Sequence, residues 1–114
     1  MNQYVVWLKH LGMNDVEHVG GKNASLGEMI ANLTDKGVRV PDGFATTAAA
    51  YREFLAYEGL DKRIHAALGE LDIENLEQLT RTGAQIRDWI AKAPLPAALA
   101  QAIGEAWAVL SAGT

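Results

Sequence analysis

Apolar residues recur at helical spacing along most of this chain, and this pattern constrains its fold more than any other feature. The pattern is clearest directly after Gly20 and Gly21, where one helix face carries Leu26, Met29, Ile30 and Leu33. Gly37 is expected to end this helix, because glycine readily adopts the left-handed conformation of a C-terminal cap. The first predicted helix therefore lies between two glycine-marked ends.

Two short helices are predicted in the middle of the chain. Thr47 is expected to cap a helix over residues 48–58, because its hydroxyl can accept a backbone N–H of the first turn. A second helix is expected over residues 60–69, with Ile64 and Leu68 buried.

Two longer helices are predicted after these. Asp72 can cap a helix over residues 74–92, whose apolar side carries Leu76, Leu79, Ile86 and Ile90. Pro94-Leu95-Pro96 then interrupts the chain, and Pro96 suits the first turn of a last helix. The stripe of that helix is Leu99, Ile103, Trp107 and Leu110, and all three tryptophans, Trp7, Trp89 and Trp107, are expected in the core.

Strand signals are few and short. Residues 4–8 (YVVWL) are rich in β-branched and aromatic side chains and indicate a buried strand. Residues 38–40 are consistent with a very short strand, residues 40–43 (VPDG) with a type I turn, and residues 44–46 with another extended segment. The predicted class is α+β, helix-rich with a few short strands. Because so small a sheet is rarely stable alone, we expect missing sequence to complete it; a mostly helical small domain is the alternative.

Charge and composition exclude several function classes. The 114 residues hold 10 Lys and Arg against 14 Asp and Glu, a net charge of -4, with no basic cluster to neutralise a run of phosphates. A nucleic-acid partner is therefore not expected. The absence of cysteine excludes a disulfide framework and a thiolate metal site. No apolar run reaches the length of a membrane span, so a cytoplasmic location without a membrane partner is the default expectation.

The segment Gly20-Gly21-Lys22 is the candidate binding site. Two glycines without Cβ atoms would let a ligand approach the backbone, and the following helix would offer unpaired N–H groups. Lys22 would add a full positive charge, so the segment is suited to a phosphate. It is not a Walker A loop, which needs glycine where Val16 stands and Ser or Thr where Asn23 stands. The alternative is an ordinary loop with a solvated lysine.

Other chemistry finds less support in the sequence. No histidine has a second ligand at metal spacing, so surface or packing roles are expected for His10, His18 and His65. Three carboxylates lie on separate predicted helices and are interpreted as solvated: Glu28, Glu53 and Glu58. Ser25 has no visible partner for a catalytic triad. We therefore predict no catalytic residue and no metal ligand in this chain.

The order of these motifs resembles the start of the phosphoenolpyruvate synthase family (pyruvate, water dikinase). The blocks that carry the resemblance are residues 5–7 (VVW), 11–16 (LGMNDV), 19–30 (VGGKNASLGEMI), 37–51 (GVRVPDGFATTAAAY), 83–90 (GAQIRDWI) and 94–96 (PLP). They extend over nearly the whole chain. Pyruvate phosphate dikinase is similar, but residues 23–25 (NAS) and the tryptophan in the first strand favour the synthase.

The resemblance implies a phosphotransferase that converts ATP, pyruvate and water to AMP, phosphoenolpyruvate and phosphate with Mg²⁺. It implies an ATP-grasp-like nucleotide-binding domain, in which Lys22, beside Gly20 and Gly21, contacts the ATP phosphates. Alternatives are pyruvate phosphate dikinase, another dikinase-type phosphotransferase such as one acting on an antibiotic or a glucan, or a non-catalytic helical interaction domain.

The resemblance also implies that much of the enzyme lies outside residues 1–114. In the family, the phosphoacceptor histidine lies in a Thr/Ser-His dipeptide that follows paired glycines. None of the three histidines of this chain matches that signature. The phosphate-binding arginine of a V-R-S-S segment, the metal-binding carboxylates and the pyruvate-binding barrel are expected beyond Thr114. Residues 1–114 are thus expected to be a truncated part of the nucleotide-binding domain, inactive alone, with ATP and the rest of the enzyme as partners. The sequence leaves open whether the enzyme is a homo-oligomer.

Overall fold

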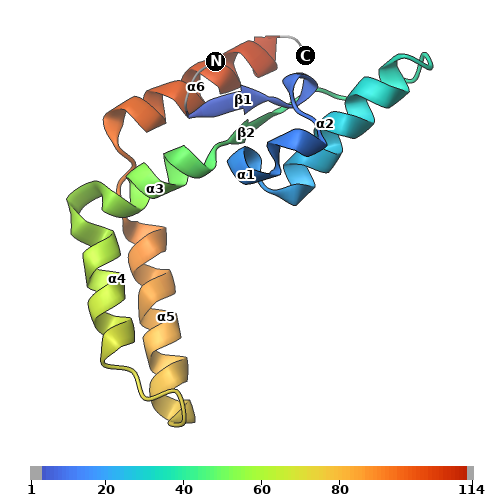
Figure 1. The fold of residues 1–114 in the computed structure, drawn as a ribbon. Helices are drawn as coiled ribbons and strands as arrows, with labels where there is room; N and C mark the ends of the chain where they lie inside the picture. Colours follow the sequence, from blue (N-terminus) through green and yellow to red (C-terminus); the bar gives the residue numbers. More distant parts are fainter. Residues whose placement is uncertain (1–3, 113–114) are drawn as a thin grey trace. The chain divides into compact units, whose positions relative to one another are not determined.

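The computed structural model describes residues 4–112, which fall into two compact units (Figure 1). One unit combines the chain up to Arg52 with the segment from Ala97 onward, and the other runs from Glu53 to Pro96. Helices dominate both units, and the sheet has two strands. The predicted helix-rich α+β class is confirmed.

The first unit is built around a two-stranded antiparallel sheet. Strand β1 (Val5–Trp7) pairs with β2 (Phe44–Thr46), with Val6 opposite Ala45. Both segments were predicted as strands. Because side chains alternate across a strand, Val5 and Val6 point to opposite faces and enter two separate apolar clusters.

Helices cover both faces of this sheet (Figure 1). On one face, Val6 and Ala45 pack with residues of the segment 8–24: Leu8, Leu11, Val19 and Ala24. On the other face, Val5 packs against helix α6 (Ala97–Ala112) through Ala102 and Ala106. Trp7 and Phe44 close this second cluster with their rings edge to face, 5.8 Å between centroids. The sheet is thus the middle layer of three.

Helix α2 (Gly21–Thr34) begins and ends where the glycines predicted. Its end is a Schellman motif: the N–H of Val38 donates to Leu33 O at 3.0 Å, and that of Gly37 donates to Thr34 O at 3.0 Å. Gly37 has φ 79°, a left-handed conformation that a residue with a Cβ adopts only at a cost. Ile30 is buried and Leu26 and Leu33 are half-buried as expected, whereas Met29 is exposed.

The segment between α2 and β2 differs from the prediction. Residues 38–40 form no strand, and residues 40–43 form no turn. The strand is absent because Val38 is engaged in the cap of α2. The Gly43 N–H donates to the Asp42 side chain at 2.9 Å and the Gly43 carbonyl accepts from Leu8 N at 2.9 Å, bonds that fix this segment without a turn.

Thr47 caps helix α3 (Ala48–Ala56), as predicted. Its hydroxyl oxygen accepts the Ala50 N–H at 3.1 Å, and the side chain is buried. We expect Thr47→Ala to lower the free energy of unfolding by about 1 kcal/mol, because a first-turn N–H loses its acceptor. Denaturant unfolding measures the change. Thr47→Ser keeps the hydroxyl and should lose less, and Thr46→Ala at the exposed neighbour is the matched control. Equal losses in all three would contradict a capping role.

The second unit is a helical hairpin. The last residues of α3 lead through the 3₁₀ turn η3 (Tyr57–Gly59) to α4 (Leu60–Gly69) and then to α5 (Leu76–Lys92). Leu60 is its buried residue, and the Arg63 guanidinium lies 4.3 Å from the centre of the Trp89 ring. Helix α4 has the predicted bounds.

Two findings in the hairpin correct the prediction, namely the cap of α5 and the exposure of its end. Asn75, not Asp72, caps α5: its side chain accepts the Gln78 N–H at 3.1 Å. The Asp72 side chain accepts the Glu74 N–H at 3.0 Å instead, so it fixes the turn before the helix. Leu68, Leu76 and Leu79, predicted on apolar faces, are 51%, 74% and 41% exposed, because all three lie near the end of the hairpin where α4 and α5 are joined.

Helix α6 buries a different stripe from the predicted one. Leu99 is buried and Ile103 and Leu110 are half-buried, but Trp107 is 62% exposed and does not belong to the core. Ala102 and Ala106 take the central positions, because small side chains let the helix approach the sheet closely. Of the other tryptophans, Trp7 and Trp89 are half-buried.

Across residues 4–112, no single helix has the length and apolar character needed to cross a membrane; α5 and α6 meet that test only when taken together as a bent pair.

Candidate functional site

Gly20 joins two helices at the start of the GGK segment. It follows the one-turn helix α1 (Val16–Val19) and is the N-cap of α2. Its φ of 84° and ψ of 161° lie in a region that is essentially restricted to glycine. The conformation of Gly20 therefore separates α1 from α2 and fixes where the first turn of α2 begins.

The first turn of α2 presents backbone donors. The helical bonding starts with Ala24 N–H donating to Gly20 O at 3.1 Å, and no side chain caps the N-terminus. The Asn23 side chain donates backwards to Val19 O at 2.8 Å, so it ties α1 to α2 rather than capping the helix. The N–H groups of residues 21–23 therefore have no acceptor within the helix. Such an end carries a partial positive charge that favours an anion.

Gly21 and Lys22 border open space. A Cβ at Gly21 would meet no atom within 4 Å, so packing within the described chain does not require glycine there. The Lys22 side chain is exposed. Among residues 4–112, the salt bridges join Glu77 to Arg81 and Asp88 to Lys92, so they do not involve Lys22. The structure thus brings Gly20, Gly21 and Lys22 together at one exposed helix start.

A second set of residues packs the middle of α2 against the segment before it, and these contacts were not recognised from the sequence. Gly27 lies against Leu11: an added Cβ would come within 2.4 Å of the Leu11 carbonyl oxygen. Glu28 is exposed, as the sequence indicated, and its side chain also accepts the Met13 N–H at 3.1 Å. The one available signal was a glycine inside a helical pattern, which often marks a close approach.

The remaining candidates gather into no further site. His10, His18 and His65 are all exposed, and the first two lie in short helices rather than loops: η1 (Leu8–His10) and α1. Ser25 donates to the Met13 sulfur at 3.7 Å. Across residues 4–112, no group of three or more His, Asp or Glu side chains could hold a metal ion.

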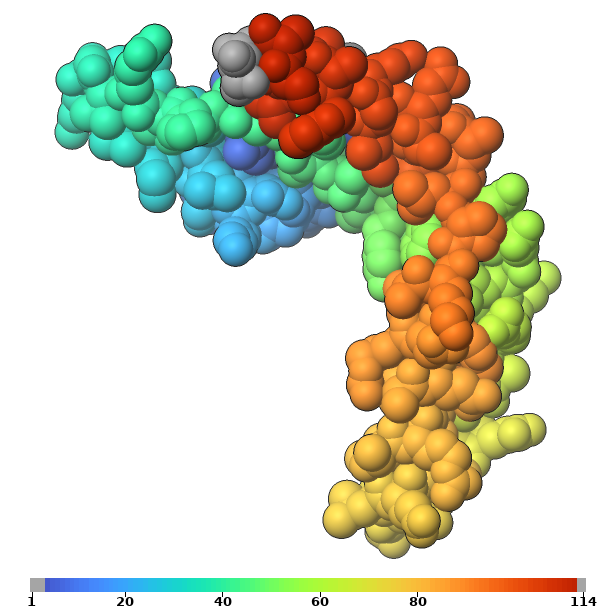
Figure 2. Space-filling view, turned by 180° about the vertical axis from the view of Figure 1, so that it is seen from behind, coloured from blue at the N-terminus to red at the C-terminus, as the bar shows by residue number. Residues whose placement is uncertain are grey.

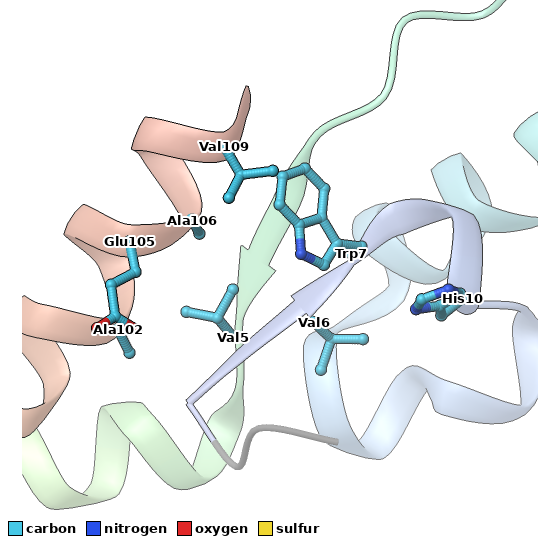
Figure 3. Close-up of a pocket in the computed structure, with 8 residues that line it drawn as sticks. All are labelled: Val5, Val6, Trp7, His10, Ala102, Glu105, Ala106 and Val109. Atoms are coloured by element: carbon cyan, nitrogen blue, oxygen red, sulfur yellow. The ribbon is translucent and has the colours of Figure 1, made fainter. Parts of the chain in front are cut away.

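An apolar hollow of about 520 Å³ lies on the other side of the first unit, between β1 and α6 (Figure 3). Figure 3 shows Val5 and Trp7 facing the side chains of α6, with Val109 beside the indole ring. Eight residues line it: Val5, Val6, Trp7, His10, Ala102, Glu105, Ala106 and Val109. It lacks Lys22 and a helix start, so its chemistry does not suit a phosphate.

Comparison with known proteins identifies the family. Residues 16–114 match the family model described as "Pyruvate phosphate dikinase, AMP/ATP-binding domain". The chain belongs to this family. The match includes the whole GGK segment, all of the second unit and the first unit from Val16 onward. The resemblance noted in the sequence is therefore confirmed at the level of the family, and an AMP/ATP-binding domain agrees with a phosphate site.

Several proteins called phosphoenolpyruvate synthase are similar to this chain over almost its entire length. The protein of Pseudomonas aeruginosa is 59% identical over 113 residues, which cover 99% of this chain and 14% of that protein. The proteins of Neisseria meningitidis and Escherichia coli are 59% and 56% identical, over 93% and 95% of this chain and 13% and 14% of theirs. The chain thus spans about one seventh of the relatives' length.

Proposed function

We propose that this chain is part of a phosphoenolpyruvate synthase and supplies one wall of its ATP phosphate site. The reaction would convert ATP, pyruvate and water to AMP, phosphoenolpyruvate and phosphate. The observation that carries the proposal is the start of α2, where Lys22 and an uncapped helix turn face open space beside Gly20 and Gly21. The family match and the names of the relatives support the nucleotide and the reaction.

The physical role of the site follows from its charges. Phosphoryl transfer needs positioned positive charge more than covalent chemistry from the protein. The N–H groups of residues 21–23 would donate to phosphate oxygens, and the Lys22 ammonium would balance their negative charge. Gly21 would let a phosphate approach the backbone without meeting a Cβ. The chain would bind and orient the phosphates, while the acceptor of the phosphoryl group would lie in the rest of the enzyme.

The finer parts of the proposal concern features beyond these residues. Mg²⁺ belongs to the proposed reaction, but residues 4–112 offer it no ligand cluster, so we assign it no step here. We also propose that residues 1–114, together with further sequence, form an ATP-grasp-like domain. A cytoplasmic location is the remaining part of the proposal. The strongest alternative is pyruvate phosphate dikinase itself, favoured by the description of the matching family.

Gly21→Ala tests whether a ligand approaches this backbone. Within the chain the methyl group meets nothing and the residue is already helical, so stability should be unchanged or rise by about 0.4–1 kcal/mol. If a phosphate lies over Gly21, kcat/KM for ATP in the full-length enzyme should nevertheless fall about tenfold, equivalent to about 1.4 kcal/mol.

The matched control for this test is Gly69→Ala, which also adds a methyl group in open space at a helical glycine. It should leave ATP kinetics unchanged. Unchanged ATP kinetics in Gly21→Ala as well would contradict a phosphate at this position.

A further inference from the structure

The tip of the α4–α5 hairpin exposes apolar side chains. Ile73 and Leu76 are 73% and 74% exposed, although isoleucine and leucine are normally buried. Leu68 and Leu79 on the adjoining helix turns are exposed as well. Figure 2 shows the turn that joins the two helices at the free end of the hairpin. We call these four residues, Leu68, Ile73, Leu76 and Leu79, the tip patch.

Hydrogen bonds fix the backbone of this tip. The Gln78 side chain accepts the Asp72 N–H at 3.0 Å and donates to the Glu70 carbonyl at 3.4 Å. Asn75 caps α5 in the same turn, and the Asp72 side chain accepts the Glu74 N–H. A loop held in this way cannot easily fold its apolar side chains inward. The tip patch is therefore displayed by the fold rather than left exposed by a flexible loop.

Exposed carboxylates alternate with the residues of the tip patch along the chain. Between Arg63 and Arg81 the sequence has no lysine or arginine and holds Glu70, Asp72, Glu74 and Glu77, all exposed. These four charges equal the entire net charge of -4 of the chain. Among residues 4–112, Glu77 pairs with Arg81 at 3.7 Å, and this pair is so exposed that it contributes little. The tip thus displays apolar side chains together with four exposed carboxylates, which we call its negative rim.

We propose that the tip patch docks onto an apolar protein surface rimmed by Lys and Arg, contributed by another part of the same full-length enzyme. Complementary charge selects such a partner, whereas a second copy of the tip or an anionic membrane would bring like charges together. The relatives are about seven times as long as this chain, so most of such an enzyme is available to supply that surface. The proposal rests on the proposed function only in taking the chain as part of the full-length enzyme.

Amide hydrogen exchange over residues 70–79 of the full-length enzyme tests the docking. The double variant Ile73→Ser with Leu76→Ser should exchange about tenfold faster than wild type in this segment, because an undocked tip opens more often. Both side chains are three-quarters exposed within the chain itself, so their loss should disturb the hairpin little. The matched control is Leu95→Ser, an exposed apolar residue outside the tip, which should leave exchange at the tip unchanged.

A second variant tests the charge of the partner. Glu70→Lys with Glu74→Lys should also speed exchange at the tip at low salt, and the effect should shrink as salt screens the rim. Wild-type exchange as fast as that of the serine variant would overturn the docking. A fast serine variant beside an unaffected lysine variant would overturn a basic partner. Neither hydrogen-exchange measurement uses ATP, so a result that overturns the docking would leave the proposed phosphate site untouched.

Discussion

Lys22→Met in the full-length enzyme should lower kcat/KM for ATP by about tenfold to somewhat over a hundredfold. This range corresponds to the 1.5–3 kcal/mol usual for a hydrogen bond to a charged group, roughly what one lysine–phosphate contact contributes. Methionine keeps much of the aliphatic stem and removes the charge, so the change isolates the electrostatic contribution. Because Lys22 is exposed at the start of α2, the fold should be little affected. Steady-state kinetics with varied ATP measure the effect.

If the proposed enzyme passes the phosphoryl group through a phosphorylated intermediate, its two half-reactions separate a binding defect from misfolding. If Lys22 contacts ATP phosphates, the step from ATP to phosphorylated enzyme should slow, whereas transfer from phosphorylated enzyme to pyruvate should continue, because ATP has already left. Lys22→Arg should recover only part of the activity, since a planar guanidinium does not replace a compact ammonium. Lys36→Met, exposed two residues after the end of the same helix, is the matched control and should leave both steps unchanged. Equal loss in both half-reactions would indicate a folding defect instead.

Gly27→Ala should produce a large loss of stability in the first unit. The added Cβ would come within 2.4 Å of the Leu11 carbonyl oxygen and 2.7 Å of its carbonyl carbon. Because these are backbone atoms, the clash cannot be relieved by turning a side chain, and α2 and the segment before it must move apart. We expect a loss of about 3 kcal/mol, at the upper end for one added methyl group in a packed interior. Denaturant unfolding of the full-length enzyme or of the chain measures it.

Gly104→Ala provides the control for this prediction. Gly104 also lies inside a helix, α6, but a Cβ there meets no atom within 4 Å. Alanine at this position should be neutral or stabilise by up to about 1 kcal/mol, through its better helix propensity. Similar changes in the free energy of unfolding for Gly27→Ala and Gly104→Ala would contradict close packing between Gly27 and Leu11.

The sequence predicted the helices well where a local signal marks their ends. Gly37 and Thr47 act on the backbone within a few residues, and the structure shows the Schellman motif and the cap that they indicate. The prediction failed where a competing local bond decided the outcome. Asn75 rather than Asp72 caps α5, because the Asp72 side chain is already engaged with Glu74 N–H in the preceding turn.

Burial was harder to predict than helix position. Trp107 has the right spacing for the stripe of α6, but the sheet contacts a face centred on Ala102 and Ala106 instead. Helical spacing places a residue on a face but does not say which face meets a partner that lies far away in the sequence. The same limit applies to Leu76, whose spacing fits the buried side of α5 although the hairpin ends there.

The candidate site itself was recognisable in outline. Two glycines, a lysine and a following helix lie next to one another in the sequence, so local rules were enough to propose a phosphate-binding segment. The scaffold behind it was not predictable in the same way. Glu28 bonds to Met13 N–H across fifteen residues of sequence, and Gly27 meets Leu11 from the neighbouring segment. Such contacts become visible only once the fold brings these segments together.

Direct binding measurements with ATP and with adenosine test the central claim that Lys22 contacts phosphate. Isothermal titration of the full-length enzyme and its Lys22→Met variant with each ligand separates the phosphates from the base. We predict that the variant binds ATP about tenfold to a hundredfold more weakly. Adenosine, which has no phosphate, should bind both proteins equally. Unchanged ATP affinity in the variant, or an equal loss for ATP and adenosine, would contradict a phosphate contact at Lys22.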